Sequence, residues 1–299
     1  MPHEGFPERA MVFGRSRHLV GVLSTPAGGS PSPPGVLFIN AGIIHRVGAS
    51  RIYVRLARAL ARRGALTLRF DLSGIGDSSQ PDSQFGGSRT EIAQRDVDEA
   101  LSLLQSEGAG PLIVAGLCSG ADDSLAAITR SSSVTGAVLL DPFAFPTRRY
   151  YTEYYGPRLL RPSSWWGVIT GKSKAAGTLS GTLKLKMPSW QRTSEPADFG
   201  DSASPTRSDY LRSIEALAAR GAHLLYLFTG GLPQRYGYQD QLFDAFPRSD
   251  LRKWVELEYL PDAGHTFRSE RMQQQLEERV LHWYDSHYRS AKSAQAPTR

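Results

Sequence analysis

The sequence is poor in cysteine and has no long apolar run, and each lack excludes a class of protein. A single cysteine, Cys118, among 299 residues allows neither an intrachain disulfide nor a cysteine-rich metal site. The longest apolar run, 224–228, is far shorter than the ~18 residues that span a bilayer, and residues 1–10 lack the apolar stretch of a secretion signal. We therefore expect a cytoplasmic protein without a membrane span.

The chain also lacks a nucleic-acid-binding signature, although its charge is basic. Lys and Arg number 35 against 29 Asp and Glu, which gives a formal net charge of +6. The arginine-rich segment 55–63 falls in a predicted helix rather than in a basic tail, and the chain has neither zinc-ligand spacing nor an aromatic-basic motif. We expect no nucleic-acid partner, no metal and no cofactor, while a basic surface would suit an acidic partner or substrate.

Short apolar segments alternate with amphipathic ones, and this alternation predicts the fold class. The predicted strands are 10–13, 19–24, 36–40, 65–70, 112–115, 136–140, 223–228 and 254–260. The predicted helices are 50–63, capped by Ser50, then 91–107, 121–129, 209–220, 239–246 and 269–288. Such spacing is typical of βαβ units, so we expect an α/β fold with a mostly parallel central sheet and helices on both faces.

The alternation stops between residues 143 and 205. This segment is rich in Gly, Ser, Thr, Pro and aromatic residues, including Trp165, Trp166 and Trp190. Long irregular insertions in compact domains often form lids or binding elements. We therefore predict a core formed by 1–142 and 206–289, a lid or cap insertion at 143–205, and a disordered tail at 290–299.

The only cysteine occupies the point where a predicted strand turns into a helix. The sequence there reads Gly116-Leu117-Cys118-Ser119-Gly120, which matches a G-x-S-x-G nucleophile elbow with Cys in place of Ser. The two glycines permit a sharp turn, and the Ser119 amide at the helix N-terminus could donate to a developing oxyanion. The alternative is a buried cysteine with a structural role only.

A histidine after the last predicted strand is the candidate base. Among seven histidines, His265 alone lies between the final strand and the final helix. The alternative is a surface histidine without a function. The other candidates are predicted to be structural or solvated: His3, His18, His223, His282 and His287.

The acid that orients this histidine is less clearly marked. Its usual place, the loop that follows strand 223–228, holds no carboxylate at 229–233. Asp141 ends the strand before it, and Asp240 comes later, in the predicted helix 239–246. Asp141 is the first candidate and Asp240 the second, although Asp141 could instead cap the turn at Pro142.

Two loops at strand ends complete the predicted site. The loop 41–46 is placed to supply the second oxyanion amide, from Ile43 or a neighbour. Its His45 and Arg46 could line a pocket, bind a substrate anion or fix the loop. The segment Asp71–Ser78 holds two glycines but is not promptly followed by a helix, so a structural turn is favoured over a dinucleotide loop.

From about Val12 to Tyr288, the chain resembles an α/β-hydrolase. The segments 40–48, 69–78 and 140–147 are similar to the exosortase-associated hydrolase-like group, whose members usually carry Ser at the elbow. The Cys-His-Asp set resembles that of dienelactone hydrolases and of the Dieckmann-type cyclases of tetramate biosynthesis. These cyclases place their acid after the strand that follows the nucleophile, which corresponds to Asp141.

These observations predict a cysteine-dependent acyl-transfer enzyme, either a hydrolase or an acyltransferase. It would act on a small-molecule ester or thioester, free or bound to a carrier protein, through an acyl-Cys118 intermediate. A Dieckmann-type or lactone-forming cyclase is the first alternative. A non-catalytic binding protein that uses the hydrolase fold is the second. The sequence does not indicate an oligomeric state.

Overall fold

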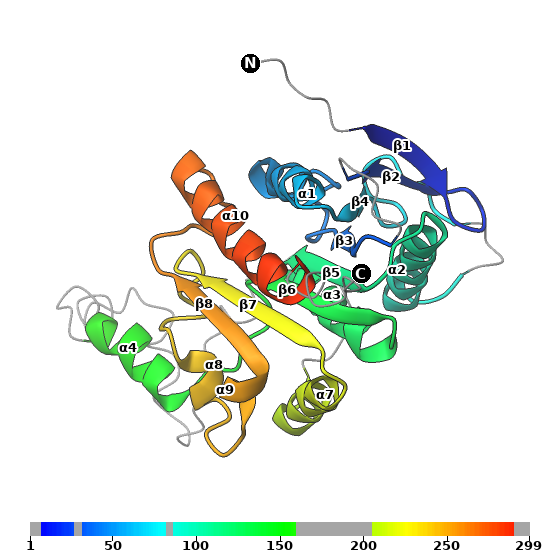
Figure 1. Ribbon diagram of the computed structural model, residues 1–299. Coiled ribbons are helices and arrows are strands. Elements are labelled where there is room, and N and C mark those ends of the chain that lie inside the picture. The colour runs from blue at the N-terminus through cyan, green and yellow to red at the C-terminus, as the bar shows by residue number, and fades with distance from the viewer. Residues whose placement is uncertain (1–6, 27–31, 82–85, 160–204, 290–299) are drawn as a thin grey trace, which may run out of the picture.

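The computed structural model describes residues 7–26, 32–81, 86–159 and 205–289, and they form a layered α/β structure (Figure 1). Its sheet has the strand order β1-β2-β4-β3-β5-β6-β7-β8. Strand β2 pairs antiparallel with β1 and with β4, and the pairs from β4 through β8 are parallel. The predicted mostly parallel sheet is confirmed. No helix in the described ranges is both long and apolar enough to cross a bilayer.

The elements follow the predicted order with shifts of a few residues. The strands are β1 (Glu8–Phe13), β2 (Leu19–Ser24), β3 (Gly35–Ile39), β4 (Leu66–Phe70), β5 (Leu112–Leu117), β6 (Val134–Leu140), β7 (His223–Thr229) and β8 (Val255–Leu260). The helices are α1 (Ile52–Arg62), α2 (Arg89–Ser106), α3 (Ser119–Arg130), α4 (Arg148–Leu159), α7 (Arg207–Ala219), α8 (Gln241–Asp244), α9 (Leu251–Trp254) and α10 (Glu270–Tyr284). The short helices α8 and α9 occupy the connection where one longer helix was predicted.

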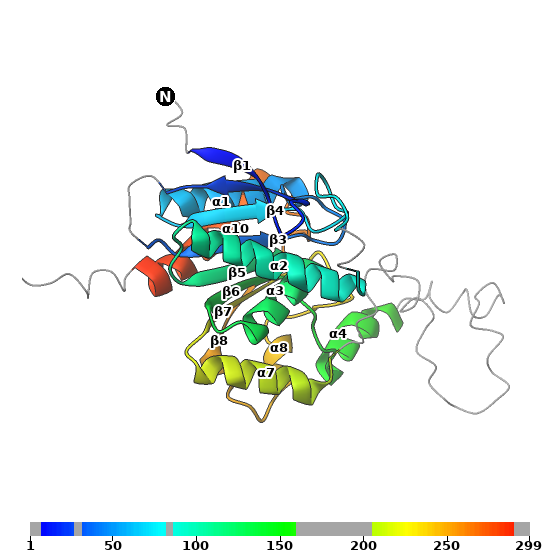
Figure 2. The ribbon, with the colours of Figure 1, turned by 90° about the vertical axis from the view of Figure 1, so that its right-hand side faces the viewer.

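The central strands are apolar on both faces because helices cover both faces. Helices α1 and α10 lie on one side of the sheet, and α2, α3 and α7 lie on the other (Figures 1 and 2). In β3, Val36 and Phe38 pack with α1 and α10, whereas Leu37 and Ile39 pack with α2 and α3. Alternate side chains of a strand point to opposite faces, so a continuous apolar run supplies both cores.

The prediction that Ser50 caps the first helix is wrong. Ser50 and Arg51 both have a left-handed backbone, with φ of 49° and 63°, and no side chain caps α1. Helix α2, by contrast, begins earlier than predicted because Ser88 and Glu91 form a capping box. The polar residues before a helix therefore predict its start only when their side chains reach the free amides.

Most of the predicted insertion lies outside the described residues, as do Trp165, Trp166, Trp190 and the tail 290–299. The part that is described begins with α4, a helix that the irregular composition did not predict. Its Tyr150 hydroxyl donates to the carbonyl oxygen of Gln234 at 2.5 Å. Helix α4 therefore packs against the loop that follows β7.

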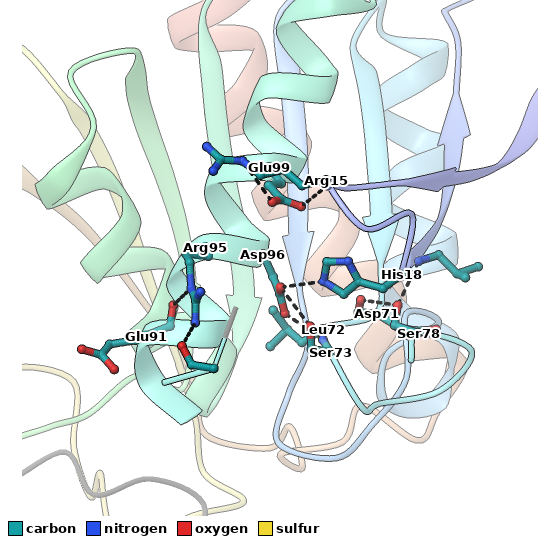
Figure 3. A network of polar contacts seen from close by, with 12 residues as sticks. Arg15, His18, Asp71, Leu72, Ser73, Ser78, Glu91, Arg95, Asp96 and Glu99 are labelled. Atoms are coloured by element: carbon teal, nitrogen blue, oxygen red, sulfur yellow. Dashed lines mark hydrogen bonds and ion pairs between the residues drawn. The ribbon is translucent and has the colours of Figure 1, made fainter. Parts of the chain in front are cut away.

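A buried aspartate on α2 joins the loop after β4 to the β1–β2 hairpin (Figure 3). Asp96 accepts hydrogen bonds from the amide and the hydroxyl of Ser73 at 2.8 and 2.9 Å, and it lies 3.5 Å from Nε2 of His18. The Ser78 hydroxyl donates to the carbonyl oxygen of Asp71 at 2.6 Å and accepts from the Val20 amide at 2.9 Å. The prediction that Asp71–Ser78 forms a structural turn is confirmed.

We predict that Asp96→Ala lowers the free energy of unfolding by about 1–3 kcal/mol, because it leaves the buried Ser73 amide and hydroxyl without acceptors. Asp98→Ala on the same helix is the matched control. Asp98 forms a surface ion pair with Arg130 at 3.1 Å, and such pairs contribute at most about 1 kcal/mol. Urea unfolding measures both variants, and equal losses would contradict a structural role for Asp96.

Candidate active site

Cys118 lies on a sharp turn between β5 and α3. Its backbone has φ of 57° and ψ of −122°, a conformation that is unfavourable for a residue with a side chain. A Cβ on Gly116 would lie 2.0 Å from the carbonyl oxygen of Gly120, and a Cβ on Gly120 would lie 2.5 Å from the carbonyl oxygen of Ile39. The two glycines are therefore needed for the close crossing of strand and helix, and the half-buried thiol is left at the carboxyl edge of the sheet.

Asp141 and His265 are hydrogen-bonded to each other beside this turn. Nδ1 of His265 lies 2.7 Å from Oδ2 of Asp141, whose side chain is 1% exposed. The amide and the hydroxyl of Thr229 each donate to the Asp141 carboxylate at 2.7 Å. Asp141 and Cys118 directly follow Leu140 and Leu117, which are paired in the β5–β6 register. The structure therefore brings the first-choice acid to the candidate base.

Asp240 does not contact this histidine. It precedes α8 and forms an ion pair with Arg252 of α9 at 3.0 Å. The acid on His265 is therefore Asp141 and not Asp240, and the pocket role of Asp240 stays a prediction.

The residues directly after β7, 230–233, carry no carboxylate, and the loop that holds His265 passes directly over them. A Cβ on Gly230 would lie 1.9 Å from the carbonyl oxygen of Pro261, and a Cβ on Gly231 would lie 2.3 Å from the amide nitrogen of His265. Glycine at both positions allows this contact. The acid then comes from the neighbouring strand β6, and Thr229 of β7 supplies the hydrogen bonds that hold it.

Arg235 is a charged residue of the site that sequence reasoning missed. Its Nη1 donates to Sγ of Cys118 at 3.6 Å and to the carbonyl oxygen of Asp141 at 3.2 Å. Arg235 lies two residues beyond 229–233, the segment in which the orienting acid is usually found. A basic residue in a loop at the carboxyl edge of the sheet was the available signal.

Charge around the sulfur favours an ion pair between the thiol and the imidazole. Burial raises the pKa of Cys118, but interactions with His265 and with the Arg235 charge outweigh it, and the net pKa is lowered. Burial lowers the pKa of His265, but the Asp141 hydrogen bond and the interaction with Cys118 raise it to about 9. Both shifts favour the charged forms, a thiolate and an imidazolium, over the neutral thiol and imidazole.

The predicted oxyanion amides lie on the turn 41–44 and at the start of α3. The Gly42 amide donates to the Ser119 hydroxyl at 2.8 Å, which ties this turn to the helix that follows Cys118. Within the described part of the chain, the amides of Ile43 and Ser119 have no hydrogen-bond acceptor. Both amides are therefore free to donate to a ligand.

In the described part of the chain, neither His45 nor Arg46 forms a hydrogen bond or ion pair with the side chains of Cys118, Asp141 and His265. The Arg46 side chain forms ion pairs with Asp71 and, at 2.5 Å, with Asp77, and its amide donates to Asp71 at 2.6 Å. The side chain of His45 is exposed. The alternative that Arg46 fixes the loop is the one that these contacts favour, and the pocket role of His45 stays a prediction.

Comparison with known proteins identifies the family. The sequence profile described as the alpha/beta hydrolase family matches residues 36–279, which is most of the chain. The chain belongs to the alpha/beta hydrolase family. Comparison with curated protein sequences finds no match.

Solved structures share the fold of this α/β-hydrolase. One is an α/β serine hydrolase without a lid from Xanthomonas campestris, at 14% identity and a TM-score of 0.56, with 100% of each chain covered. Another is the esterase Pf2001 from Pyrococcus furiosus, at 14% identity and a TM-score of 0.59, with 94% of this chain and 91% of that chain covered. Such low identity establishes the α/β-hydrolase fold and leaves the activity to be argued from the site.

A cavity of about 940 Å³ adjoins the site of this α/β-hydrolase through Gly42 and Ser119. Its wall is partly apolar, with Phe143, and partly acidic, with Asp122 and Asp123 of α3. Burial raises the pKa of Asp122 to about 6, against the opposing effects of the Phe143 amide and Arg235. Across the described ranges, no three His, Cys, Asp or Glu side chains converge as metal ligands would.

We predict that Gly231→Ala displaces the His265 loop, because the new methyl group would meet the His265 amide nitrogen at 2.3 Å. Gly264→Ala is the matched control, since a Cβ there meets nothing within 4 Å. A misplaced catalytic group costs about 100-fold in rate, so the reactivity of Cys118 toward activated esters should fall by that order in the first variant only. Similar rates in both variants would contradict the close packing of these loops.

Proposed function

We propose that this α/β-hydrolase is a cysteine-dependent acyl-transfer enzyme that acts on an ester or thioester. The observation that carries the proposal is the hydrogen-bonded set of Asp141 and His265 beside a thiol whose pKa is lowered. A thiolate is the reactive form of cysteine, and an adjacent base oriented by a third group is the arrangement that nucleophilic catalysis requires.

In the acylation step, the Cys118 thiolate attacks the carbonyl carbon of the substrate. The carbonyl oxygen becomes an oxyanion, to which the free amides of Ser119 and Ile43 donate. When the intermediate collapses, the bond to the leaving group breaks. The His265 imidazolium then gives its proton to the departing alkoxide or thiolate, which leaves a neutral ring and an acyl-Cys118 thioester.

In the second step, His265 acts as the base. The negative charge of the Cys118 sulfur is one cause of the raised pKa of His265. Because acylation removes that charge, the pKa of His265 falls toward its ordinary range. The neutral ring takes a proton from the acceptor as the acceptor attacks the thioester. Asp141 holds the ring in the tautomer whose other nitrogen faces the sulfur.

The acceptor decides between hydrolysis, transfer and cyclisation. Water gives a hydrolase, an alcohol or amine gives an acyltransferase, and a carbanion of the acyl chain gives a Dieckmann-type cyclase. The position of Asp141 after β6 favours the cyclase as the second candidate, through the resemblance described above. The ester substrates implied by the name of the Pyrococcus enzyme favour hydrolysis.

A non-catalytic binding protein explains the site less well. Such a protein gains nothing from a strained backbone at Cys118 or from a base oriented by a buried acid. We place the enzyme in the cytoplasm, where a lone reactive thiol stays reduced. The donor is a small-molecule acyl ester or thioester, and the basic chain would also suit a thioester carried on an acidic protein.

Intact-mass spectrometry with a panel of activated esters and thioesters tests the proposed function. The wild type should gain the mass of one acyl group, and neutral hydroxylamine should remove it, because hydroxylamine cleaves thioesters. Cys118→Ala should gain nothing and should lose turnover. An adduct on the alanine variant, or turnover by it, would remove the covalent mechanism.

We predict that Asp141→Asn reduces turnover by about 10²–10⁴-fold, because the His265 ring loses its orientation and its counter-charge. The pKa of His265 should fall from about 9 for the same reason, and imidazole NMR titration measures this. Asp240→Asn serves as the control, with activity close to wild type. If the Asp240 variant lost the larger share of activity, Asp141 would not be the orienting acid.

A further inference from the structure

The guanidinium of Arg235 contacts the sulfur and the backbone of the acid at the same time. One nitrogen, Nη1, donates to Cys118 Sγ at 3.6 Å and to the Asp141 carbonyl oxygen at 3.2 Å. These acceptors follow neighbouring strands, β5 and β6, at the same level of the sheet. The charge is therefore placed between two elements that are already fixed relative to each other.

The backbone that carries Arg235 is held on both sides. The Arg235 carbonyl oxygen accepts from Nε2 of Gln241 at 2.9 Å, and Gln241 is fully buried. Oε1 of Gln241 accepts from the Gly237 amide at 2.8 Å. The ring of Tyr236 stacks on that of Phe228 at 3.7 Å between centroids. The loop is thus anchored to β7, and the guanidinium extends from a fixed position.

We propose that Arg235 is a catalytic residue that holds Cys118 as a thiolate through its own charge, independently of the protonation state of His265. This inference rests on the proposed function, since it takes Cys118 as the nucleophile. On ionisation, the S–H bond breaks and its proton passes to the His265 ring. The sulfur keeps the electron pair, and the Arg235 N–H donates to it.

A guanidinium and an imidazolium differ in how long their charge persists. The arginine side chain stays positive at every pH at which an enzyme works. The histidine loses its charge whenever it gives a proton to a leaving group, and also as pH rises through about 9. A thiolate paired only with His265 would lose its counter-charge at these points. Arg235 removes that dependence and also stabilises the sulfur as the leaving group of the second step.

Other ionisable groups surround the elbow and set the background for this effect. They are Tyr53 of α1, Asp122 and Asp123 of α3, Asp141 after β6 and His265 after β8. Burial raises the pKa of Tyr53 far above its ordinary value, so this hydroxyl stays neutral. Burial raises the pKa of both α3 aspartates to about 6. The effect of Arg235 is therefore measured above that pH, where their charges no longer change.

The rate of Cys118 alkylation by iodoacetamide, followed against pH on the full-length protein, tests the inference without any substrate. Arg235→Gln should raise the apparent thiol pKa by about one unit or more, which lowers the alkylation rate about tenfold at pH values below the wild-type pKa. His265→Asn should raise it too, and the double variant should raise it further by the same amount as Arg235→Gln alone. Arg235→Lys should recover part of the loss, because it keeps the charge without the planar fork.

Arg252→Gln is the matched control, since this arginine lies on the neighbouring α9 and pairs with Asp240. It should leave the thiol titration unchanged. Arg235→Met keeps the apolar stem without the charge and replaces the glutamine variant if that variant does not fold. An unchanged titration in the neutral variants would overturn the inference. So would a shift that disappears in the His265→Asn background, because Arg235 would then act through the histidine.

The two proposals can fail separately. If no acyl adduct forms on Cys118 but Arg235→Gln shifts the thiol titration, the proposed function fails and the charge effect stands. If the adduct forms and the titration does not shift, the proposed function stands and the role of Arg235 is wrong.

Discussion

A carboxylate buried at the end of one strand and held by the next strand is the interaction on which the site depends. Burial of an ionised carboxylate costs several kcal/mol unless hydrogen bonds and a counter-charge offset the loss of water. Asp141 receives two hydrogen bonds from Thr229 and one from His265. The same three contacts compensate the buried acid for its lost water and fix the ring, so the stability of the acid and the geometry of the base have one origin.

The remaining parts of the site are positioned by close backbone contacts. Gly116 and Gly120 allow α3 to begin against β3, and Gly230 and Gly231 allow the His265 loop to cross the end of β7. These contacts leave no room for side chains at the four positions. The functional groups are therefore carried by other residues: Cys118 lies between Gly116 and Gly120, and Asp141 follows the neighbouring strand β6. Arg235 reaches the sulfur from a loop anchored by Gln241.

The sequence predicted the structure correctly where neighbouring residues alone determine the local conformation. The apolar runs predicted the strands, and the glycine spacing around Cys118 predicted the turn that the structure has. It was less informative where two distant segments compete for one position. Its place at a strand end made Asp141 the first candidate, but Asp240 stayed open because the choice depends on how the His265 loop fills the space after β7. Arg235 was missed for the same reason, since the sulfur that it contacts lies far along the chain. Ser50 failed as a cap for a local reason, because its own backbone is left-handed.

Cys118 and Asp141 follow paired residues of β5 and β6, and this pairing limits how the two residues can move relative to each other. Leu117 pairs with Leu140, and Leu140 with Leu227, in one continuous parallel register. The amides of Cys118 and Asp141 extend this ladder by donating to the carbonyl oxygens of Leu140 and Leu227, each at 2.8 Å. Sliding one residue relative to the other would break bonds of the central strands, which open only with the whole domain. Slow exchange of these two amide hydrogens with solvent would accordingly report the integrity of the entire molecule.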